Sequence, residues 1–363
     1  MKKILFIVAH RPGRSPGQRF RVEQYLAYIK EKGFSYEFSY LLNEQDDKNF
    51  YSTGNYFQKF IILLKSIFLR YRDLKRAKDF DIIFIYREAV MFGSIFFEKR
   101  FKKSGAKIIL DFDDAIWLMD VSEGNKNLRW LKRPSKTAEI LGLTDMAFVG
   151  NNYLAKYAEQ YANNVKIVPT TLDTDNIDLK THKPVDRICI GWTGSYTTLK
   201  HFDLAVPFLK RILEKYPGKV KIKLISNHNY VKEIDLEFCS WSKEKEIEDI
   251  SEFDIGIMPL PDDDWARGKC GFKGLQYMAL GIPAIMSPVG VNTEIIQDGE
   301  NGLLAGSDDE WVEKISKLIE SPELRKEIGL KGRQTVEERY SFNAWKDKYV
   351  SLFEELISEQ NHS

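Results

Sequence analysis

Short apolar runs alternate with longer stretches of helical periodicity in the first half of the chain. Each run is bounded by polar or turn residues, and residues 18–32 have the spacing of a helix. The runs are Ile4–Val8, a weaker Tyr36–Tyr40, Ile82–Tyr86, Lys107–Leu110, Met146–Val149 and Val165–Val168. Buried strands separated by helices indicate a parallel sheet covered on both faces.

A second series of the same kind follows a polar stretch. Residues 173–187 show neither strand nor helix periodicity and predict a linker between domains. The later runs are Ile188–Trp192, Val220–Ile225, Leu236–Cys239, Ile255–Met258, Ala284–Met286 and Leu303–Leu304. Two such series predict an α/β protein with two doubly wound, Rossmann-like domains, at 1–172 and 188–342, and a last helix at 343–359.

Composition narrows the class of protein. Of 363 residues, 43% are hydrophobic and 29% charged, and the net charge of +1 argues against a basic nucleic-acid-binding protein. Cys189, Cys239 and Cys270 are too widely spaced for a disulfide framework or zinc site, so we expect a reducing compartment and no metal. The first apolar run is too short for a signal peptide, and no run reaches the ~18 residues of a membrane span. We expect a cytoplasmic protein.

Ligands of open parallel sheets bind beyond the carboxyl ends of the strands. After Ile4–Val8, the loop up to Arg21 contains four arginines and two glycines and leads into a helix. Backbone approach at glycine and positive charge fit a phosphate or an anionic acceptor. A solvated loop is the alternative.

Three carboxylates end the run Lys107–Leu110. Asp111, Asp113 and Asp114 are placed to orient an acceptor hydroxyl, to accept its proton or to bind a divalent ion. The alternative is a helix N-cap with the other carboxylates solvated.

Two loops of the second domain carry candidate phosphate ligands. Residues 191–198 are small and hydroxylic, lack the spacing of a nicotinamide fingerprint, and precede Lys200. Residues 265–283 combine three cations and several glycines with a helix predicted at 274–280. Positive charge, backbone N–H groups and a helix N-terminus would then converge on one anion. Gln276, in the first turns of that helix, could reach a ribose hydroxyl.

With these residues assembled, the chain resembles family-4 glycosyltransferases of the GT-B fold over nearly its whole length. The most specific stretch is Lys-Gly-Leu-Gln-Tyr-Met-Ala-Leu-Gly-Ile-Pro at 273–283. Residues 294–304 and 167–173 are similar to the family's closing motif and to the exit of its first domain. The resemblance implies a nucleotide-sugar donor on the C-terminal domain and an acceptor on the N-terminal one. It further implies transfer with retention in the cleft between them, no metal or other cofactor, and a last helix that crosses back.

The resemblance also assigns roles. Gln276 stands where the family often has a ribose-binding glutamate, and Asp113 and Asp114 stand where it often has a histidine. For the donor, the expected ligands are Gly17, Arg19, Thr193, Gly194, Ser195, Lys200, Ser226, Asn227, Trp241, Arg267, Cys270, Gly271, Phe272 and Gln276. Of these, Ser226, Asn227 and Trp241 lie where the base is expected. Lys269 and Lys273, together with Lys200, are candidates for the diphosphate.

Two departures bear on activity. Gly268 replaces the first glutamate of the family's pair, and 191–195 lack the family's common arginine. Arg267, Lys269 and Lys273 offer replacement charge, so we favour an altered phosphate site over an inactive enzyme. We expect a retaining glycosyltransferase acting on a glycan or lipid-linked acceptor, as in bacterial surface polysaccharide synthesis. The alternatives are a sugar-nucleotide epimerase and a non-catalytic sugar-nucleotide-binding protein.

Residues 57–78 form a basic amphipathic stretch, with seven Lys/Arg against one Asp. Such a helix can lie on the inner face of an anionic membrane, which would suit a lipid-linked acceptor. The interpretation we favour is a domain helix that packs its apolar face on the sheet.

Overall fold

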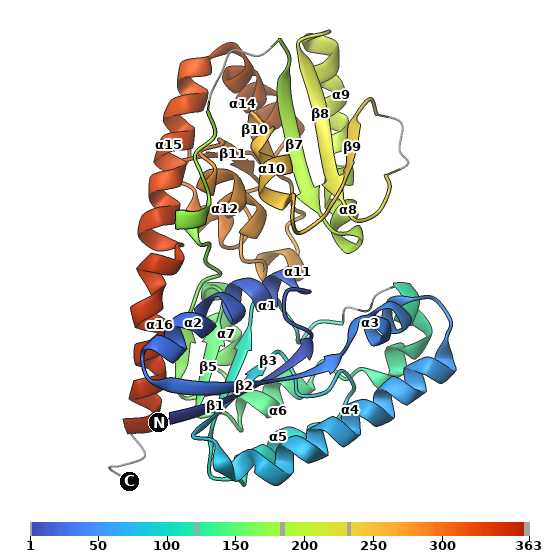
Figure 1. The fold of residues 1–363 in the computed structure, drawn as a ribbon. Helices are drawn as coiled ribbons and strands as arrows, with labels where there is room; N and C mark the ends of the chain where they lie inside the picture. The colour runs from blue at the N-terminus through green and yellow to red at the C-terminus, as the bar shows by residue number, and fades with distance from the viewer. Residues whose placement is uncertain (1, 120, 122, 182–185, 231–233, 359–363) are drawn as a thin grey trace. The chain divides into compact units, whose positions relative to one another are not determined.

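The computed structural model describes residues 2–119, 121, 123–181, 186–230 and 234–358. Internal contacts divide the chain into two compact units (Figure 1). The first unit runs up to Thr171 and resumes at Trp345, and the second unit is Leu172–Ala344. Each unit contains one six-stranded sheet, so the prediction of an α/β protein with two doubly wound domains is confirmed.

All six apolar runs of the first unit are strands, and every neighbouring pair is parallel. Their order in the sheet is β2-β1-β3-β4-β5-β6. The order reverses between β1 and β3, and such a switch point is where open sheets bind ligands. The strands are β1 Lys2–His10, β2 Phe34–Leu42, β3 Ile82–Tyr86, β4 Lys107–Phe112, β5 Met146–Val149 and β6 Val165–Ile167.

The predicted continuous helix at 18–32 is broken into shorter pieces. Val22 leaves the helical region at φ −125° and ψ −60°, and the Gln24 side-chain amide donates to the Phe20 carbonyl at the break. The first-unit helices are α1 Pro16–Arg21, α2 Leu26–Glu31, α3 Glu44–Tyr51, α4 Tyr56–Arg76, α5 Phe96–Lys102, α6 Lys136–Leu141 and α7 Asn152–Ala158, with 3-10 turns Glu23–Tyr25, Ala77–Asp79 and Glu123–Leu131.

The helix α4 corrects one expectation. Ile62 packs with Leu41 and Leu42 of β2, but the other fully buried positions of α4 are polar, and most of its large apolar side chains are exposed. The reason is a set of polar partners beneath it: the Arg70 guanidinium donates to the Val8 carbonyl at 2.9 Å and to the Ala89 carbonyl at 2.7 Å.

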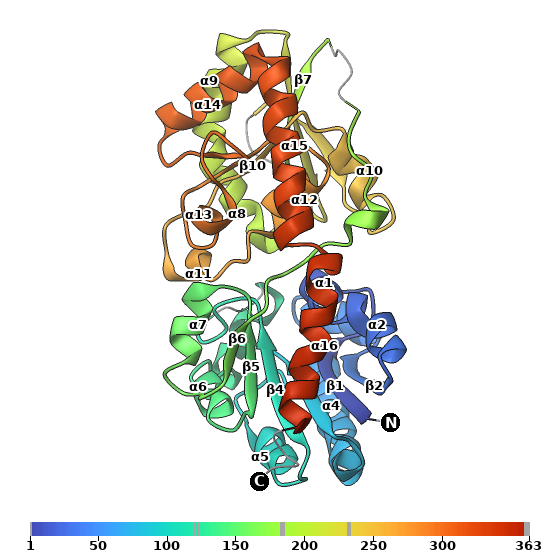
Figure 2. The ribbon, with the colours of Figure 1, turned by 90° about the vertical axis from the view of Figure 1, so that its left-hand side faces the viewer.

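The last helix, α16 (Phe342–Ser358), lies along the first-unit sheet (Figure 2). Aromatic side chains join the two. Phe353 of α16 stacks on Phe148 of β5 with ring centroids 6.1 Å apart. Tyr349 stacks on Tyr25 at 4.1 Å. The chain therefore returns to its first unit after completing the second; residue 359 of the predicted helix 343–359 lies outside the described residues.

The six runs of the second unit are also parallel strands. Read from β9, the order is β9-β8-β7-β10-β11-β12, which is the Rossmann order with its switch point between β7 and β10. The strands are β7 Ile188–Gly194, β8 Val220–Ser226, β9 Glu237–Ser240, β10 Ile255–Met258, β11 Ala284–Met286 and β12 Leu303–Leu304. The Phe253 ring packs directly against the backbone of Gly191, where a Cβ would overlap it.

Helices cover the second sheet, and one of them fixes the polar stretch 173–187. The Arg333 guanidinium donates to the Thr174 carbonyl at 2.8 Å and to the Ile177 carbonyl at 2.7 Å, while 182–185 lie outside the described residues. The helices are α8 Leu199–Phe202, α9 Val206–Lys215, α10 Glu246–Ser251, α11 Asp264–Arg267, α12 Phe272–Ala279, α13 Asn292–Ile295, α14 Asp308–Glu320 and α15 Pro322–Arg339, with 3-10 turns Thr174–Asn176, Tyr196–Thr198 and Asp203–Ala205.

Candidate functional site

Carboxylates and an arginine meet at the carboxyl ends of β3 and β4, beside the switch point of the first unit. Asp113 and Asp114 follow β4, and Arg87 follows β3. Arg87 Nη2 lies 2.6 Å from Asp113 Oδ1 and 2.5 Å from Asp114 Oδ2. The Tyr86 hydroxyl donates to Asp113 Oδ1 at 2.8 Å. We call Tyr86, Arg87, Asp113 and Asp114 the carboxylate cluster.

The backbone near the cluster is unusual at two positions. Gly17 lies so close that a Cβ there would overlap the Tyr86 hydroxyl and the Asp113 carboxylate. Arg87 adopts φ +66°, a left-handed conformation that is costly for a residue with a side chain. The structure therefore brings Gly17 and Asp113, which were predicted separately, into one place.

Burial and charge shift the ionisation of the cluster. Burial opposes the charge of Arg87, yet Asp113, Tyr86 and Asp114 raise its pKa well above the ordinary value. Burial, followed by the neighbouring carboxylates, raises the pKa of Tyr86 well above its ordinary value despite the opposing effect of Arg87. Tyr86 therefore remains a hydrogen-bond donor and Arg87 a cation at neutral pH.

A second ion pair lies beneath the cluster. Arg21 and Asp111 are 2% and 1% exposed, and Arg21 Nε lies 3.0 Å from both carboxylate oxygens of Asp111. Arg21 Nη1 also donates to the Val168 carbonyl at 2.7 Å. Because this pair is buried and mutually satisfied, Asp111 has a structural role here.

The other arginines of the first loop have partners that the sequence did not indicate. Arg14 Nε lies 2.6 Å from Asp47 Oδ2, and Arg11 Nη1 lies 3.7 Å from the same oxygen. The Arg19 guanidinium lies 4.8 Å from the Phe20 ring centroid. Asp47 of α3 therefore balances part of the charge predicted for an anionic ligand.

Three lysines act on one buried histidine at the switch point of the second unit. His201 of α8 is 4% exposed, and its Nδ1 has no hydrogen-bond partner among the described residues. Burial, then the charges of Lys273, Lys269 and Lys200, lower the pKa of His201 to about 4. We call these three lysines with His201 the lysine cluster. It unites Lys200, Lys269 and Lys273, which were predicted in two separate loops.

The helix that leads away from the lysine cluster carries Gln276. Gly271, at φ +67°, turns the chain into α12 after the half-buried Cys270, and Phe272 begins the helix. Gln276 is 2% exposed, and its Nε2 has no partner in the described part of the chain. A buried amide without a partner is costly and is typical of a ligand site.

Arg267 is placed differently from the lysines. Its Nε lies 2.8 Å from Asp262 and its Nη1 lies 3.3 Å from Asp264, so two carboxylates balance its charge. Gly268 is buried and ends α11. Arg267 is therefore neutralised by carboxylates of its own helix and the residues just before it.

The predicted base-binding residues gather at the ends of β7, β8 and β9. Asn227 Oδ1 accepts from the Tyr196 backbone N–H at 2.8 Å, and the rings of Tyr196 and His228 lie 4.6 Å apart. Ser226 is fully buried, and its carbonyl accepts from the Trp241 N–H at 3.0 Å. In the neighbouring turn, Thr193, Gly194 and Ser195 lie at the carboxyl end of β7.

Several functional candidates were missing from the sequence analysis. Tyr86 and Arg87 stand directly after an apolar run, at the strand end where the ligand rule applies, and could have been found there. His201 gave no such signal, because a single histidine in a helical stretch has no distinctive spacing. Asp47 lies in a helix far along the sequence from the arginines that it balances.

Two six-stranded, doubly wound units of this kind form the GT-B fold. Sucrose-phosphate synthase from Thermosynechococcus elongatus matches 99% of this chain and 100% of its own with a TM-score of 0.71 at 13% sequence identity. HepE from Anabaena, solved in complex with UDP and glucose, matches 98% and 99% with a TM-score of 0.66 at 12% identity. These likenesses confirm the predicted fold.

Sequence comparison points to the same class. Residues 187–321 match the family described as glycosyl transferases group 1. The capsular polysaccharide biosynthesis glycosyltransferase CapM of Staphylococcus aureus is 25% identical over 210 residues, 54% of either chain. Spore coat protein SA of Bacillus subtilis is 30% identical over 182 residues, 45% of this chain and 48% of its own.

The chain thus spans about half the length of the curated relatives it matches. Residues 187–321 therefore resemble the glycosyltransferases of this family, and the whole chain has the GT-B fold. Membership of family 4 within that class stays a prediction.

None of the helices in the described part of the chain is long and apolar enough to cross a bilayer. In the same part of the chain, His, Cys, Asp and Glu form no group of three or more suited to a metal ion.

Proposed function

We propose that this protein transfers a sugar from a nucleotide-sugar donor to a hydroxyl of a glycan or lipid-linked acceptor, with retention at the anomeric carbon. The donor binds the second unit, and the acceptor binds the first. The observation that carries this proposal is the lysine cluster, where three cations act on one buried histidine at the switch point of a Rossmann-ordered sheet.

The lysine cluster suits a nucleoside diphosphate as leaving group. When the bond between the anomeric carbon and the diphosphate oxygen breaks, negative charge grows on that oxygen. Cations held in place before the reaction stabilise this charge without reorganisation, and such stabilisation is often the largest catalytic contribution. Lys269 and Lys273 fill this role, and Lys200 makes a smaller contribution.

The nucleoside binds next to that cluster in this proposal. Gln276 Nε2 is buried without a protein partner and is the candidate donor to a ribose oxygen. Asn227 and Trp241, with Tyr196 and His228, offer polar atoms and rings for the base. HepE, which shares the fold, was solved with UDP, which supports a nucleotide of this kind.

The carboxylate cluster serves the acceptor. Asp113 is held by Tyr86 and Arg87, so its carboxylate is fixed where an acceptor hydroxyl would approach β3 and β4. The hydroxyl oxygen forms the new bond to the anomeric carbon, and its proton passes to Asp113 or to the departing diphosphate. Asp113 and Asp114 thus position the hydroxyl. No metal or organic cofactor enters this scheme, because the lysines supply the countercharge.

The biological setting of the proposal is surface polysaccharide synthesis. CapM, the relative from Staphylococcus aureus, is a capsular polysaccharide biosynthesis glycosyltransferase. Such a role is compatible with a lipid-linked acceptor.

The test follows nucleoside diphosphate release from a panel of nucleotide sugars, with and without glycan and lipid-linked acceptors. Release that requires an acceptor, together with a product retaining the donor's anomeric configuration by NMR, is the expected result. Conversion of the donor sugar without release would indicate an epimerase. Donor binding by calorimetry without either reaction would indicate a binding protein.

One matched pair of variants tests the acceptor role. Asp113→Asn should lower kcat/KM for the acceptor by roughly a hundredfold or more, typical of a positioned acid–base group. Asp309→Asn, at an exposed carboxylate of α14, should leave it unchanged. Equal rates in both variants would remove Asp113 from the mechanism.

A further inference from the structure

The helix α4 has its polar side buried and its apolar side exposed. Arg70 and Asp73 are fully buried, with Arg70 Nη1 3.0 Å from Asp73 Oδ2 and Ser39 Oγ 2.6 Å from the same oxygen. At the other end of the helix, buried Lys59 Nζ donates to the Ser52 carbonyl at 2.7 Å and to Asn125 Oδ1 at 2.9 Å. These directional bonds at both ends fix the rotation of the helix about its axis.

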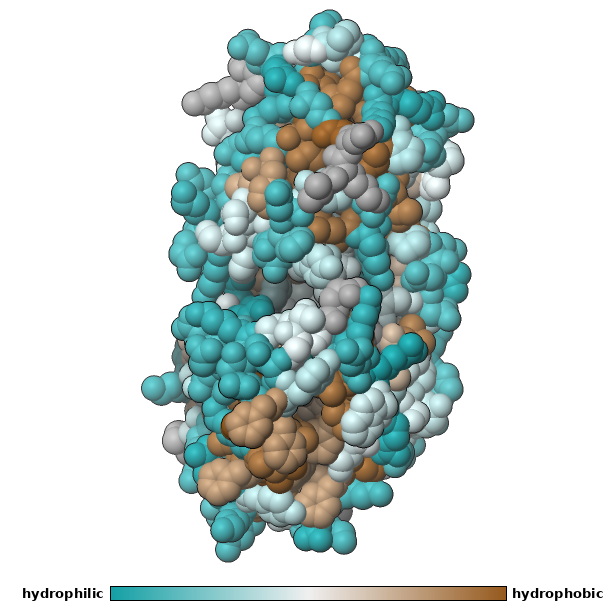
Figure 3. Space-filling model, turned by 90° about the vertical axis from the view of Figure 1, so that its right-hand side faces the viewer, coloured by the Kyte–Doolittle hydropathy of each residue, from teal (hydrophilic) through white to brown (hydrophobic). Residues whose placement is uncertain are grey.

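Fixed in this rotation, α4 presents a continuous row of large apolar side chains to solvent. Their exposed fractions reach 71% at Phe57 and 69% at Phe68. Figure 3 shows apolar side chains gathered on this face of the molecule. We call the row the α4 stripe; its members are Phe57, Phe60, Ile61, Leu64, Phe68 and Tyr71.

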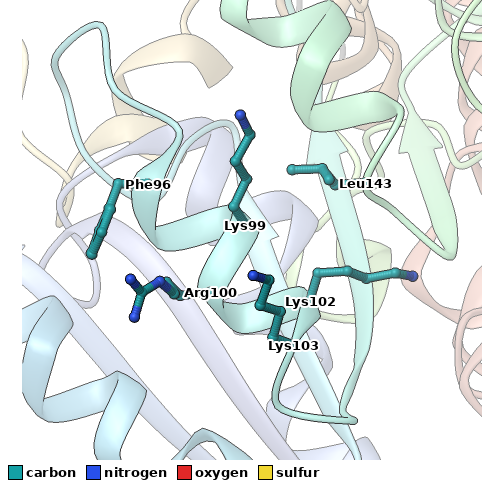
Figure 4. A pocket seen from close by; sticks show the side chains of 6 residues that line it. All are labelled: Phe96, Lys99, Arg100, Lys102, Lys103 and Leu143. Carbon is teal, nitrogen blue, oxygen red and sulfur yellow. The ribbon is translucent and has the colours of Figure 1, made fainter.

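The α4 stripe continues onto α5 and ends beside a group of cations. Tyr71 and Phe96 have ring centroids 5.8 Å apart, and the Arg100 guanidinium lies 4.8 Å from the Phe96 ring centroid. Phe96 also borders a hollow of about 360 Å³ (Figure 4). We call it the α5 hollow; its lining is Phe96, Lys99, Arg100, Lys102, Lys103 and Leu143.

The cations of the α5 hollow are mostly not neutralised. Lys102 Nζ pairs with Asp145 at 2.8 Å. Lys99, Arg100 and Lys103 form no ion pair with any residue in the described ranges. Three positive charges therefore remain available next to an exposed apolar stripe.

We propose that the α4 stripe and the α5 hollow form a docking surface for an anionic phospholipid bilayer. The stripe enters the boundary between headgroups and acyl chains, and the cations of the hollow contact lipid phosphates. This assignment rests on the first unit alone and does not depend on the proposed transfer reaction.

Charge and shape favour a membrane over a protein as the occupant. An α4 of 21 residues is about 31 Å long at 1.5 Å per residue, which suits a helix lying in the plane of a bilayer surface. Of the six Lys/Arg of α4, Lys59 and Arg70 are buried, and Lys65 and Arg76 pair with carboxylates. Arg72 and Lys75 remain exposed and add to the cations of the α5 hollow, and exposed cations beside an apolar face are typical of interfacial helices on anionic lipids. Exposed phenylalanines at this density also mark an interaction site rather than ordinary surface.

The experiment measures sedimentation of the full chain with sucrose-loaded vesicles, either of phosphatidylcholine alone or with phosphatidylglycerol added. Wild type should bind the anionic vesicles at low salt, and 0.5 M NaCl should weaken that binding because charges at a surface are screened. Phe57→Ser/Phe68→Ser should lower the partition coefficient roughly thirtyfold or more. Lys99→Gln/Arg100→Gln/Lys103→Gln should lower it roughly a hundredfold on anionic vesicles only.

Matched controls in the second unit separate this surface from general hydrophobicity and charge. Leu204→Ser/Leu330→Ser removes two exposed apolar side chains, and Lys210→Gln/Lys219→Gln/Lys326→Gln removes three exposed cations. Both should bind like wild type. Circular dichroism and thermal melting should show all variants folded, since the changed side chains are exposed.

Three results would overturn the proposal. Wild type could fail to bind anionic vesicles at low salt, or the stripe variant could bind as well as its control. Light scattering could instead show a dimer that the stripe substitutions dissociate, without vesicle binding by the monomer; a second copy of the chain would then be the occupant.

Discussion

The loops at the carboxyl ends of the strands carry side chains of opposite charge in the two units. Beside the switch point of the first unit, Arg87 binds Asp113 and Asp114, and Tyr86 donates to Asp113. At the switch point of the second, three lysines act together on a buried histidine. Both units place their loops by the same rule of parallel sheets, so the fold fixes where a ligand binds and the side chains fix which kind.

The two units also differ in the surroundings of their charged side chains. In the first, every carboxylate discussed has a basic partner within hydrogen-bond distance, including the buried pair of Arg21 and Asp111. In the second, the lysines depress the pKa of a neighbouring base. A carboxylate held by a cation suits a neutral hydroxyl, whereas clustered cations suit a diphosphate.

The largest expected effect is a loss of stability when Asp111, the carboxylate that we assign a structural role, is replaced. Asp111→Ala should lower the free energy of unfolding by about 3–5 kcal/mol, because Arg21 would remain buried with its charge uncompensated. Guanidinium denaturation followed by circular dichroism measures this. Asp114→Ala, at a less buried carboxylate of the same loop, is the control and should cost far less. Similar losses in both would show that Asp111 is not the structural member of the group.

The next effect tests the cationic side of the comparison. Lys269→Ala and Lys273→Ala should each lower kcat/KM for the donor roughly a hundredfold, because the leaving diphosphate loses a fixed countercharge. Lys210→Ala, at an exposed position of α9 in the same unit, should leave kcat/KM unchanged. Donor turnover near the wild-type value in both cluster variants would remove the diphosphate assignment and, with it, the contrast between the two units.

The sequence predicted the fold well because buried parallel strands leave a direct record. All twelve apolar runs are strands in two parallel sheets, whereas the order of the strands, which differs between the two sheets, was not predicted. The continuity of 18–32 was wrong because the break at Val22 depends on where the Gln24 side chain reaches. The predicted orientation of α4 was wrong for a related reason. Periodicity identifies an apolar face, but the hydrogen-bond partners of Arg70 decide which face of the helix is buried.

The sequence predicted which loops form the candidate site, but not which residues hold the site side chains in place. Strand ends pointed to Asp113, Lys269 and Lys273, and glycines pointed to Gly17. The residues that hold these groups, such as Arg87, come from other strands, and only the folded sheet brings them within reach. The sequence likewise did not show that Arg267 is neutralised, because its ion pairs with Asp262 and Asp264 form only when the short helix α11 folds.

The smallest predicted effect uses His201 as a reporter of the lysine cluster. In the folded protein its pKa is lowered to about 4, while an unfolded histidine titrates near 6.5. Between these values the unfolded chain binds more protons, so stability falls as the pH drops from 7 towards 4. From pH 7 to pH 5, wild type should lose about 2 kcal/mol more than His201→Gln, measured by urea denaturation at both pH values. A nucleoside diphosphate that neutralises Lys269 and Lys273 should reduce this difference, because part of the depression comes from their charges. An identical acid response in wild type and variant would show that His201 is not held neutral, and the lysines would then act on no shared group.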